Sequence, residues 1–271
     1  MTESTKRFDV LTVIGLAATA YVVTTLLHEG LGHGGACVAV GGKPMAWGAY
    51  YFDCTTQGLP DWAYRAVAAA GNTVNLVVAC LMGLILNGRL KDPQTPRGAG
   101  TVFLWLMFCL NGFTWAGYFL FSGIAGIGDW GVEKDAVLYG VANQTVWRIV
   151  MTIFGGAAYF LLVRSAGNLL GRLIGGDNRQ TGRWLAWTAY FTGGILAFLI
   201  GLMNPVGFVI VLISSLASSL GGTSGLWWLH RFMRPQPEAA FALTRNWLWI
   251  VLGVVAAAAY AVVFGPTLKL A

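Results

Sequence analysis

The chain has 271 residues, of which 56% are hydrophobic and only 10% are charged, and it carries a net charge of +6. A soluble domain has about 25% charged residues. The 10% in this chain is too small a share to cover a water-exposed surface. This composition excludes disordered, nucleic-acid-binding and ordinary cytosolic classes and predicts a single polytopic membrane domain over residues 1–271.

Seven apolar runs are long enough, or nearly so, to cross a bilayer, which takes about 20 helical residues. Together they predict an all-α membrane protein with about seven transmembrane helices. The runs cover residues 10–27, 66–86, 102–124, 146–163, 184–203, 206–229 and 247–264.

The basic residues lie between the runs and predict the orientation, because cytoplasmic loops carry an excess of Lys and Arg. With the N-terminus inside, 12 of the 17 basic residues are cytoplasmic: Lys6, Arg7, Arg89, Lys91, Arg97, Arg164, Arg172, Arg179, Arg183, Arg231, Arg234 and Arg245. The other five are outside: Lys43, Arg65, Lys134, Arg148 and Lys269. We therefore expect an integral protein of a bacterial inner membrane, with a cytoplasmic N-terminus and an extracytoplasmic C-terminus.

Two segments differ from both spans and simple loops. Residues 34–62 are rich in Gly and aromatic residues, which predicts a membrane-associated hairpin, and Cys37 and Cys54 can form a disulfide there if the loop is extracytoplasmic. Residues 127–145 mix charged and apolar residues, which predicts a helix lying along the interface.

One polar cluster, His28-Glu29-Gly30-Leu31-Gly32-His33, ends the first apolar run. An ionisable residue at membrane depth costs roughly 2.5–3.5 kcal/mol on insertion scales, so three together indicate partners or a function. Imidazole is the commonest metal ligand, and a neighbouring carboxylate suits a general base. The alternative is a polar cap in the headgroup region, and Cys37 is a reserve ligand.

The spacing of the two histidines needs a distorted helix. Five residues of α-helix advance about 500°, which leaves His33 about 140° from His28. Gly30 and Gly32 tolerate a π-bulge, which takes up one extra residue. We therefore predict a π-bulge between the two histidines.

The stretch LGHGGA at 31–36, after His28-Glu29, resembles the active-site helix of the site-2 protease family of intramembrane zinc metalloproteases. AAGNTVN at 69–75 is similar to that family's small-residue and Asn motif, and GIGDW at 126–130 to the segment that supplies an aspartate ligand. The resemblance covers about residues 10–135 and leaves 136–271 as additional helices.

This resemblance implies one zinc ion held by His28, His33 and Asp129. It also implies Glu29 as general base and Asn75 as a residue that positions the substrate or the oxyanion. The expected activity is hydrolysis of a peptide bond in or near a membrane helix. The expected partners are membrane lipids and a transmembrane-helix substrate or partner membrane proteins, with no nucleic acid.

Two other functions stay open: a non-catalytic membrane subunit that keeps a structural or vestigial metal site, and a membrane metalloenzyme acting on a lipid or small molecule. Asn72, like Asn75, can serve either catalysis or an interhelical hydrogen bond. Asn111 is interpreted as a packing residue, and His230 as a contact to lipid headgroups. The small polar residues of the sixth run indicate close helix packing or, alternatively, a lined cavity.

Overall fold

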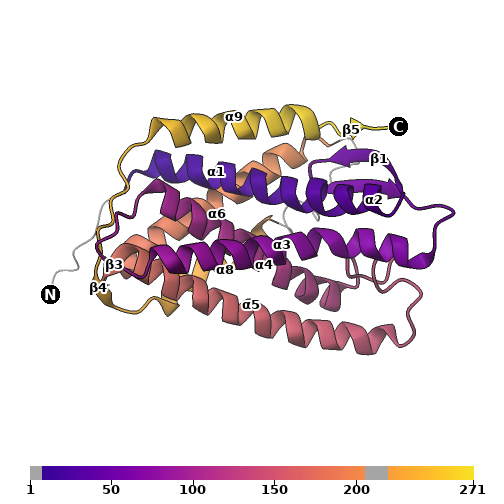
Figure 1. The fold of residues 1–271 in the computed structure, drawn as a ribbon, viewed down its shortest axis with the longest axis horizontal. Coiled ribbons are helices and arrows are strands. Elements are labelled where there is room, and N and C mark those ends of the chain that lie inside the picture. Colours follow the sequence, from indigo (N-terminus) through magenta and orange to yellow (C-terminus); the bar gives the residue numbers. More distant parts are fainter. Residues whose placement is uncertain (1–7, 205–218) are drawn as a thin grey trace.

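The computed structural model describes residues 8–204 and 219–271, which form an elongated helical bundle (Figure 1). Six helices are long and apolar enough to cross a membrane: Val10–Ala39, Asp61–Arg89, Ala99–Ala125, Gln144–Ile174, Arg179–Gly201 and Trp247–Phe264. They correspond to six of the seven predicted runs and confirm the predicted all-helical membrane architecture. Most of the other run, 206–229, lies outside the described residues.

The first membrane helix is continuous in space but changes its winding. It begins as α1 (Val10–Leu26), where the Asp9 side chain caps the helix by accepting the Thr12 N–H at 2.9 Å. It continues as the π-helix η1 (Leu27–Gly34) and ends as α2 (Gly35–Ala39). The polar cluster therefore lies inside the membrane helix, near one end of the bundle.

The core forms around α4 (Ala99–Ala125), which lies between its neighbours α3 (Asp61–Arg89) and α5 (Gln144–Ile174). Trp105 of α4 is fully buried, and its indole N–H donates to the Ala166 carbonyl at 3.1 Å. Such internal partners matter in a membrane, where no water satisfies the indole. The indole of Trp105 therefore ties α4 to α5.

The remaining helices complete the bundle around this core. The helix α6 (Arg179–Gly201) packs on α1, and the short α8 (Gly225–Trp228) and η3 (Leu229–Phe232) pack against α6 and α5. The last helix, α9 (Trp247–Phe264), runs beside α1 (Figure 1). The backbones of α1 and α9 touch, since a Cβ added to Gly15 would lie 2.4 Å from the Trp249 carbonyl oxygen.

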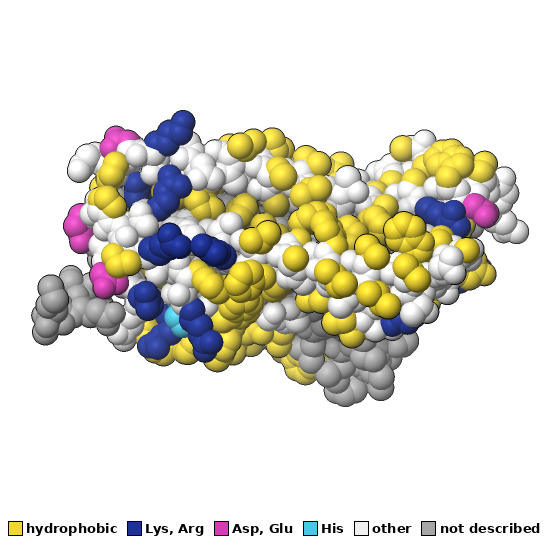
Figure 2. Space-filling view, turned by 90° about the horizontal axis from the view of Figure 1, so that it is seen from below, with side chains coloured by type: hydrophobic (Ala, Val, Ile, Leu, Met, Phe, Trp, Pro, Cys, Tyr) yellow, Lys and Arg dark blue, Asp and Glu magenta, His cyan; other side chains and the backbone are white. Residues whose placement is uncertain are grey.

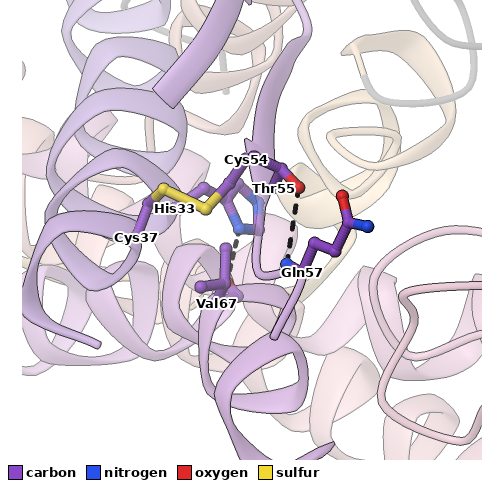
Figure 3. Close-up of a disulfide and its surroundings, with 6 residues drawn as sticks. All are labelled: His33, Cys37, Cys54, Thr55, Gln57 and Val67. Carbon is purple, nitrogen blue, oxygen red and sulfur yellow. Dashed lines mark hydrogen bonds between the residues drawn. A yellow bond between two sulfur atoms is a disulfide. The ribbon is translucent and has the colours of Figure 1, made fainter. Parts of the chain in front are cut away.

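The hairpin predicted within residues 34–62 is confirmed. Strands β1 (Lys43–Gly48) and β2 (Tyr51–Thr55) pair antiparallel, and β5 (Leu268–Lys269) adds to β1, giving the order β2-β1-β5. A disulfide joins Cys37 of α2 to Cys54 of β2 (Figure 3), which ties the hairpin to the helix that carries the histidines. A second small sheet, β3 (Gly175–Gly176) with β4 (Gln236–Glu238), lies at the other end of the bundle.

The prediction of an interfacial helix over residues 127–145 is wrong. This segment consists of turns and bends until α5 begins at Gln144. Gly126, Gly128 and Gly140 have φ angles of 77°, 84° and 68°, which a right-handed helix cannot accommodate. The glycines therefore fold the segment back on itself, and this fold places Asp129.

The two ends of the bundle differ in charge. Lys and Arg side chains gather at the end where α1 begins (Figure 2), and the C-terminus lies at the opposite end (Figure 1). Which compartment each end faces stays a prediction.

Candidate metal centre

The π-helix η1 brings the two histidines onto one face, as predicted, and it extends over eight residues. Its i→i+5 bonding suits residues five apart. The glycines are needed for packing as well as winding. A Cβ on Gly30 would lie 2.4 Å from the Trp47 ring, and one on Gly32 would lie 2.5 Å from the Gly71 Cα.

Three polar atoms meet at this point, one from each residue predicted as a ligand. His28 Nε2 and His33 Nε2 are 3.1 Å apart. The Asp129 Oδ2 atom lies 3.2 Å from His28 Nε2 and 3.4 Å from His33 Nε2. The histidines are buried, and the Asp129 side chain is 20% exposed. These three residues form a group that could hold a metal ion.

The other ring nitrogen of each histidine is held by an oxygen acceptor. His33 Nδ1 donates to the Val67 carbonyl at 2.7 Å (Figure 3). His28 Nδ1 donates to Asn75 Oδ1 at 2.5 Å. A proton on each Nδ1 leaves the lone pair of each Nε2 directed at the shared point, which is how second-shell groups orient metal-binding histidines.

A relay of amides fixes the orientation of Asn75. Its Nδ2 donates to Asn111 Oδ1 at 2.9 Å, and Asn111 Nδ2 donates to the Met107 carbonyl at 2.8 Å and to Thr24 Oγ1 at 3.1 Å. A backbone carbonyl can only accept, so the Met107 carbonyl fixes which end of the Asn111 amide faces it. The orientation of Asn111 then fixes that of the Asn75 amide, and Asn75 fixes the tautomer of His28. Asn111 therefore orients the site and is more than the packing residue that the sequence indicated.

Two imidazole lone pairs and a carboxylate repel one another at these distances unless a cation lies among them. A proton on one Nε2 would satisfy a single pair, whereas a metal ion satisfies all three atoms. Ligand atoms about 2.0–2.1 Å from zinc at tetrahedral angles lie roughly 3.3–3.4 Å apart. The observed separations of 3.1–3.4 Å fit such a site.

Electrostatics keep Asp129 in the anionic form that a metal needs. Burial acts to raise the pKa of this carboxyl, but the charge of His33 and hydrogen bonds from His28 and His33 outweigh it. The net effect lowers the pKa of Asp129 below its ordinary value. A cation held by the same three atoms would favour the carboxylate in the same way, because its positive charge would replace that of His33.

Two residues that sequence reasoning missed complete the surroundings. The Tyr118 ring stacks on His28, with centroids 5.0 Å apart and an interplanar angle of 16°. Gly71 faces both ligands, because an added Cβ would lie 2.6 Å from His33 Nε2 and 2.7 Å from His28 Nε2. Gly71 belongs to the AAGNTVN stretch at 69–75, which by itself gives this glycine no role, and nothing in the sequence signals Tyr118.

A cleft of about 260 Å³ opens beside the three ligands. Glu29, His33 and Asp129 are among the residues that line it. Glu29 is only 4% exposed, and its Oε2 atom has no hydrogen-bond partner among the described residues. Other lining residues come from the hairpin region and from the segment after α4: Tyr50, Tyr51, Phe52, Asp53, Cys54, Thr56, Gly128, Glu133, Lys134, Asp135 and Ala136.

Two further predictions concern residues at and near this site. Cys37 is not a reserve ligand, because its sulfur is bonded to Cys54. Asn72 is 1% exposed on α3, and neither its Oδ1 nor its Nδ2 has a hydrogen-bond partner among residues 8–204 and 219–271. Its polar atoms therefore do not supply the interhelical bond expected of a packing asparagine.

Comparison of the chain with protein-family models, with curated proteins and with solved structures finds no match. The similarity to site-2 proteases therefore stays a prediction from the motifs at 28–36, 69–75 and 126–130.

Proposed function

We propose that this protein is an intramembrane metalloprotease of the site-2 protease type, with one zinc ion held by His28, His33 and Asp129. The observation that supports it most is the 3.1–3.4 Å triangle of ligand atoms beside a cleft that Glu29, His33 and Asp129 line. Bound zinc supplies Lewis-acid chemistry, which polarises a carbonyl group and acidifies water.

Glu29 is the general base and acid of the proposed reaction. Its carboxylate is buried in the wall of the cleft and has an oxygen free to receive a proton. It takes the proton from the attacking water and passes it to the nitrogen of the leaving peptide. Such proton transfer contributes about 10²–10⁴-fold to a rate.

Asn75 acts through His28. Its oxygen accepts from His28 and its nitrogen donates to Asn111, so the amide is engaged on both sides. This geometry favours a positioning role for Asn75 over the direct contact with substrate that the family resemblance implies.

The substrate is a membrane-embedded helix that unwinds locally. A peptide carbonyl in an intact helix is hydrogen-bonded and cannot reach the ligands, whereas an extended segment fits a cleft between a hairpin and a folded loop. Lipids surround the bundle, and partner membrane proteins would bring or restrain the substrate.

The cleft faces the extracytoplasmic side of a bacterial inner membrane in this proposal. Disulfides persist in oxidising compartments, and the one between Cys37 and Cys54 lies at the cleft end. The excess of basic residues at the other end favours the same orientation, with the N-terminus cytoplasmic and the C-terminus extracytoplasmic.

The test uses the purified full chain in proteoliposomes with a synthetic single-span helix that contains helix-breaking residues. Wild-type protein should hold one zinc ion and cleave this reporter. Glu29→Gln should keep the zinc and lose at least about 100-fold in cleavage, and His28→Ala should lose the zinc. Asp53→Asn, which changes another acid of the same cleft, is the matched control and should keep both.

Full cleavage by Glu29→Gln, or full zinc content in His28→Ala, would overturn the proposal. Zinc in the wild type without cleavage of any membrane helix would favour the non-catalytic subunit with a structural metal site. Release of a fragment from a lipid or small molecule instead would favour the other enzyme class.

A further inference from the structure

A second cleft, of about 320 Å³, lies at the end of the bundle opposite the candidate metal centre. Arg179, Gln180 and Arg183 from the first turns of α6 line one side, and His230 and Arg231 from η3 line the other. A histidine flanked by arginines is visible on this surface (Figure 2). The cleft is independent of the proposed protease activity.

The lining is rich in hydrogen-bond donors and contains no acidic residue. Arg183 Nε is buried and has no hydrogen-bond partner among the described residues. Arg179 donates from one guanidinium nitrogen to the Met233 carbonyl at 3.2 Å, and within residues 8–204 and 219–271 no second hydrogen bond of its side chain is found. Buried donors without acceptors are costly, so this arrangement indicates a ligand with several acceptor oxygens.

The positive field in the cleft has several sources. Burial is the largest cause that lowers the pKa of His230, and the charges of Arg183 and Arg231 lower it further. The α6 helix begins at Arg179, so the positive end of its dipole also points here. An anion is the ligand that this field favours.

Tryptophans place the cleft at headgroup depth. The Arg183 guanidinium lies 5.5 Å from the Trp184 ring centroid and 5.2 Å from that of Trp187. Trp187 stacks on Trp227 with centroids 4.3 Å apart, and its indole N–H donates to the Trp227 carbonyl at 2.8 Å. Tryptophan prefers the membrane–water interface, where the phosphates of lipids lie.

We propose that this cleft is a binding site for a phosphate group, occupied by the headgroup of an anionic phospholipid. Guanidinium groups match phosphate oxygens in pairs, and Arg183 and Arg231 approach the cleft from opposite sides. The neighbouring tryptophans would contact the acyl chains of a lipid, whereas a free phosphate ion has no apolar part to contact them.

The test titrates short-chain phosphatidylglycerol into the purified full chain in a neutral detergent and measures the dissociation constant by calorimetry. Arg183→Gln/Arg231→Gln should bind about 30-fold more weakly, because each basic residue near a membrane surface is worth about a fivefold change in affinity. The control Arg89→Gln/Lys91→Gln removes the same charge from exposed residues that do not line the cleft and should bind like the wild type.

Short-chain phosphatidylcholine and inorganic phosphate are the comparison arms. Weak binding of both, with tight binding of phosphatidylglycerol, supports an anionic-lipid site. Displacement of the lipid by millimolar inorganic phosphate supports the phosphate site but assigns it to the free ion. An equal loss of affinity in the control variant, or equal binding of phosphatidylcholine, overturns the proposal.

Discussion

The two ends of the bundle differ in which charged residues line their clefts. The cleft end holds carboxylates inside and around the candidate metal centre: Glu29, Asp53, Asp129, Glu133 and Asp135. The opposite end presents arginines at the surface, around a cleft without acids. The comparison teaches that two clefts of one apolar protein can differ in charge: the charged residues that line the first are acidic apart from Lys134, and those that line the second are basic.

The ends also differ in how their backbone is built. The cleft end carries a π-helix, a hairpin, a disulfide and a folded segment after α4. The basic end closes with turns and the two-stranded sheet of β3 and β4. We therefore expect substitutions at the cleft end to change metal binding, and equivalent substitutions at the basic end to leave it unchanged.

Gly71→Ala should have the largest effect. The added methyl would lie 2.6–2.7 Å from the Nε2 atoms of both histidines, which are the atoms proposed to bind the metal. We expect zinc content, measured by mass spectrometry of the purified protein, to fall to background. Gly88→Ala is the control on the same helix, since nothing lies within 4 Å of its added Cβ. Stoichiometric zinc in Gly71→Ala would contradict the ligand assignment.

Asn75→Ala should weaken zinc binding by about 10–100-fold, the usual cost of losing a second-shell partner. Asn111→Ala should act in the same direction, and the double variant should cost little more than Asn75→Ala, because the amides act in series. Competition with a chelator gives the affinities. Asn87→Ala, also on α3 but near its other end, should bind zinc normally. Additive losses of zinc affinity in the double variant would contradict a relay in which the two amides act in series.

Cys37→Ser/Cys54→Ser should lower the free energy of unfolding by about 3 kcal/mol, as the loop-entropy model gives for a crosslink spanning 17 residues. The reason is that the unfolded chain gains freedom when the crosslink is removed. The measurement is the melting temperature with and without reductant. Reductant should lower the value for the wild type and leave the variant unchanged, whereas insensitivity of the wild type would argue against the bond. Cys80→Ser, which changes a free and exposed cysteine, should have no such effect.

Arg245→Gln, at the basic end, should have the smallest effect. It removes an ion pair of 3.0 Å to Asp9, but the Arg245 side chain is 51% exposed, and exposed pairs contribute little. We expect unchanged zinc content and a smaller fall in melting temperature than the disulfide variant shows. A fall as large as that of the cysteine variant would show that the pair anchors α1 more strongly than its exposure indicates.

Much of the fold could be predicted from the sequence because membrane spans depend on long apolar runs. Six of the seven runs are helices, although α5 extends to Ile174, well beyond the predicted end at 163. Hydropathy marks the part of a helix within the bilayer and does not detect a polar continuation past it. The segment 127–145 was misjudged because its composition suits an interfacial helix, while its glycines adopt positive φ.

The candidate site was predictable where rare residues mark it. Histidines and acids are so scarce in this chain that His28, Glu29 and His33 stand out as a cluster, and the spacing of the two histidines predicts the π-helix. Asp129 has several acidic competitors in the sequence and is singled out only by the resemblance of GIGDW at 126–130 to the family segment. The relay through Asn111 was not predictable, because it depends on which carbonyl a side chain meets in space. Tyr118 was missed for the same reason, since one tyrosine in an aromatic-rich helix carries no distinguishing signal.

The π-helix has a consequence for how this chain can change by insertion or deletion. Removing one residue between His28 and His33 would allow ordinary α winding, but it would turn one side of the helix by about 100° relative to the other. If the part of the helix after the deletion stayed in place, Tyr21 would turn away from Thr223, with which its hydroxyl forms a hydrogen bond of 2.7 Å. If the part that carries Tyr21 stayed in place instead, Gly32 would lose its contact with α3. The extra residue thus sets the phase between the two halves of the membrane span, and a shorter version of the motif would have to arise together with a repacked bundle.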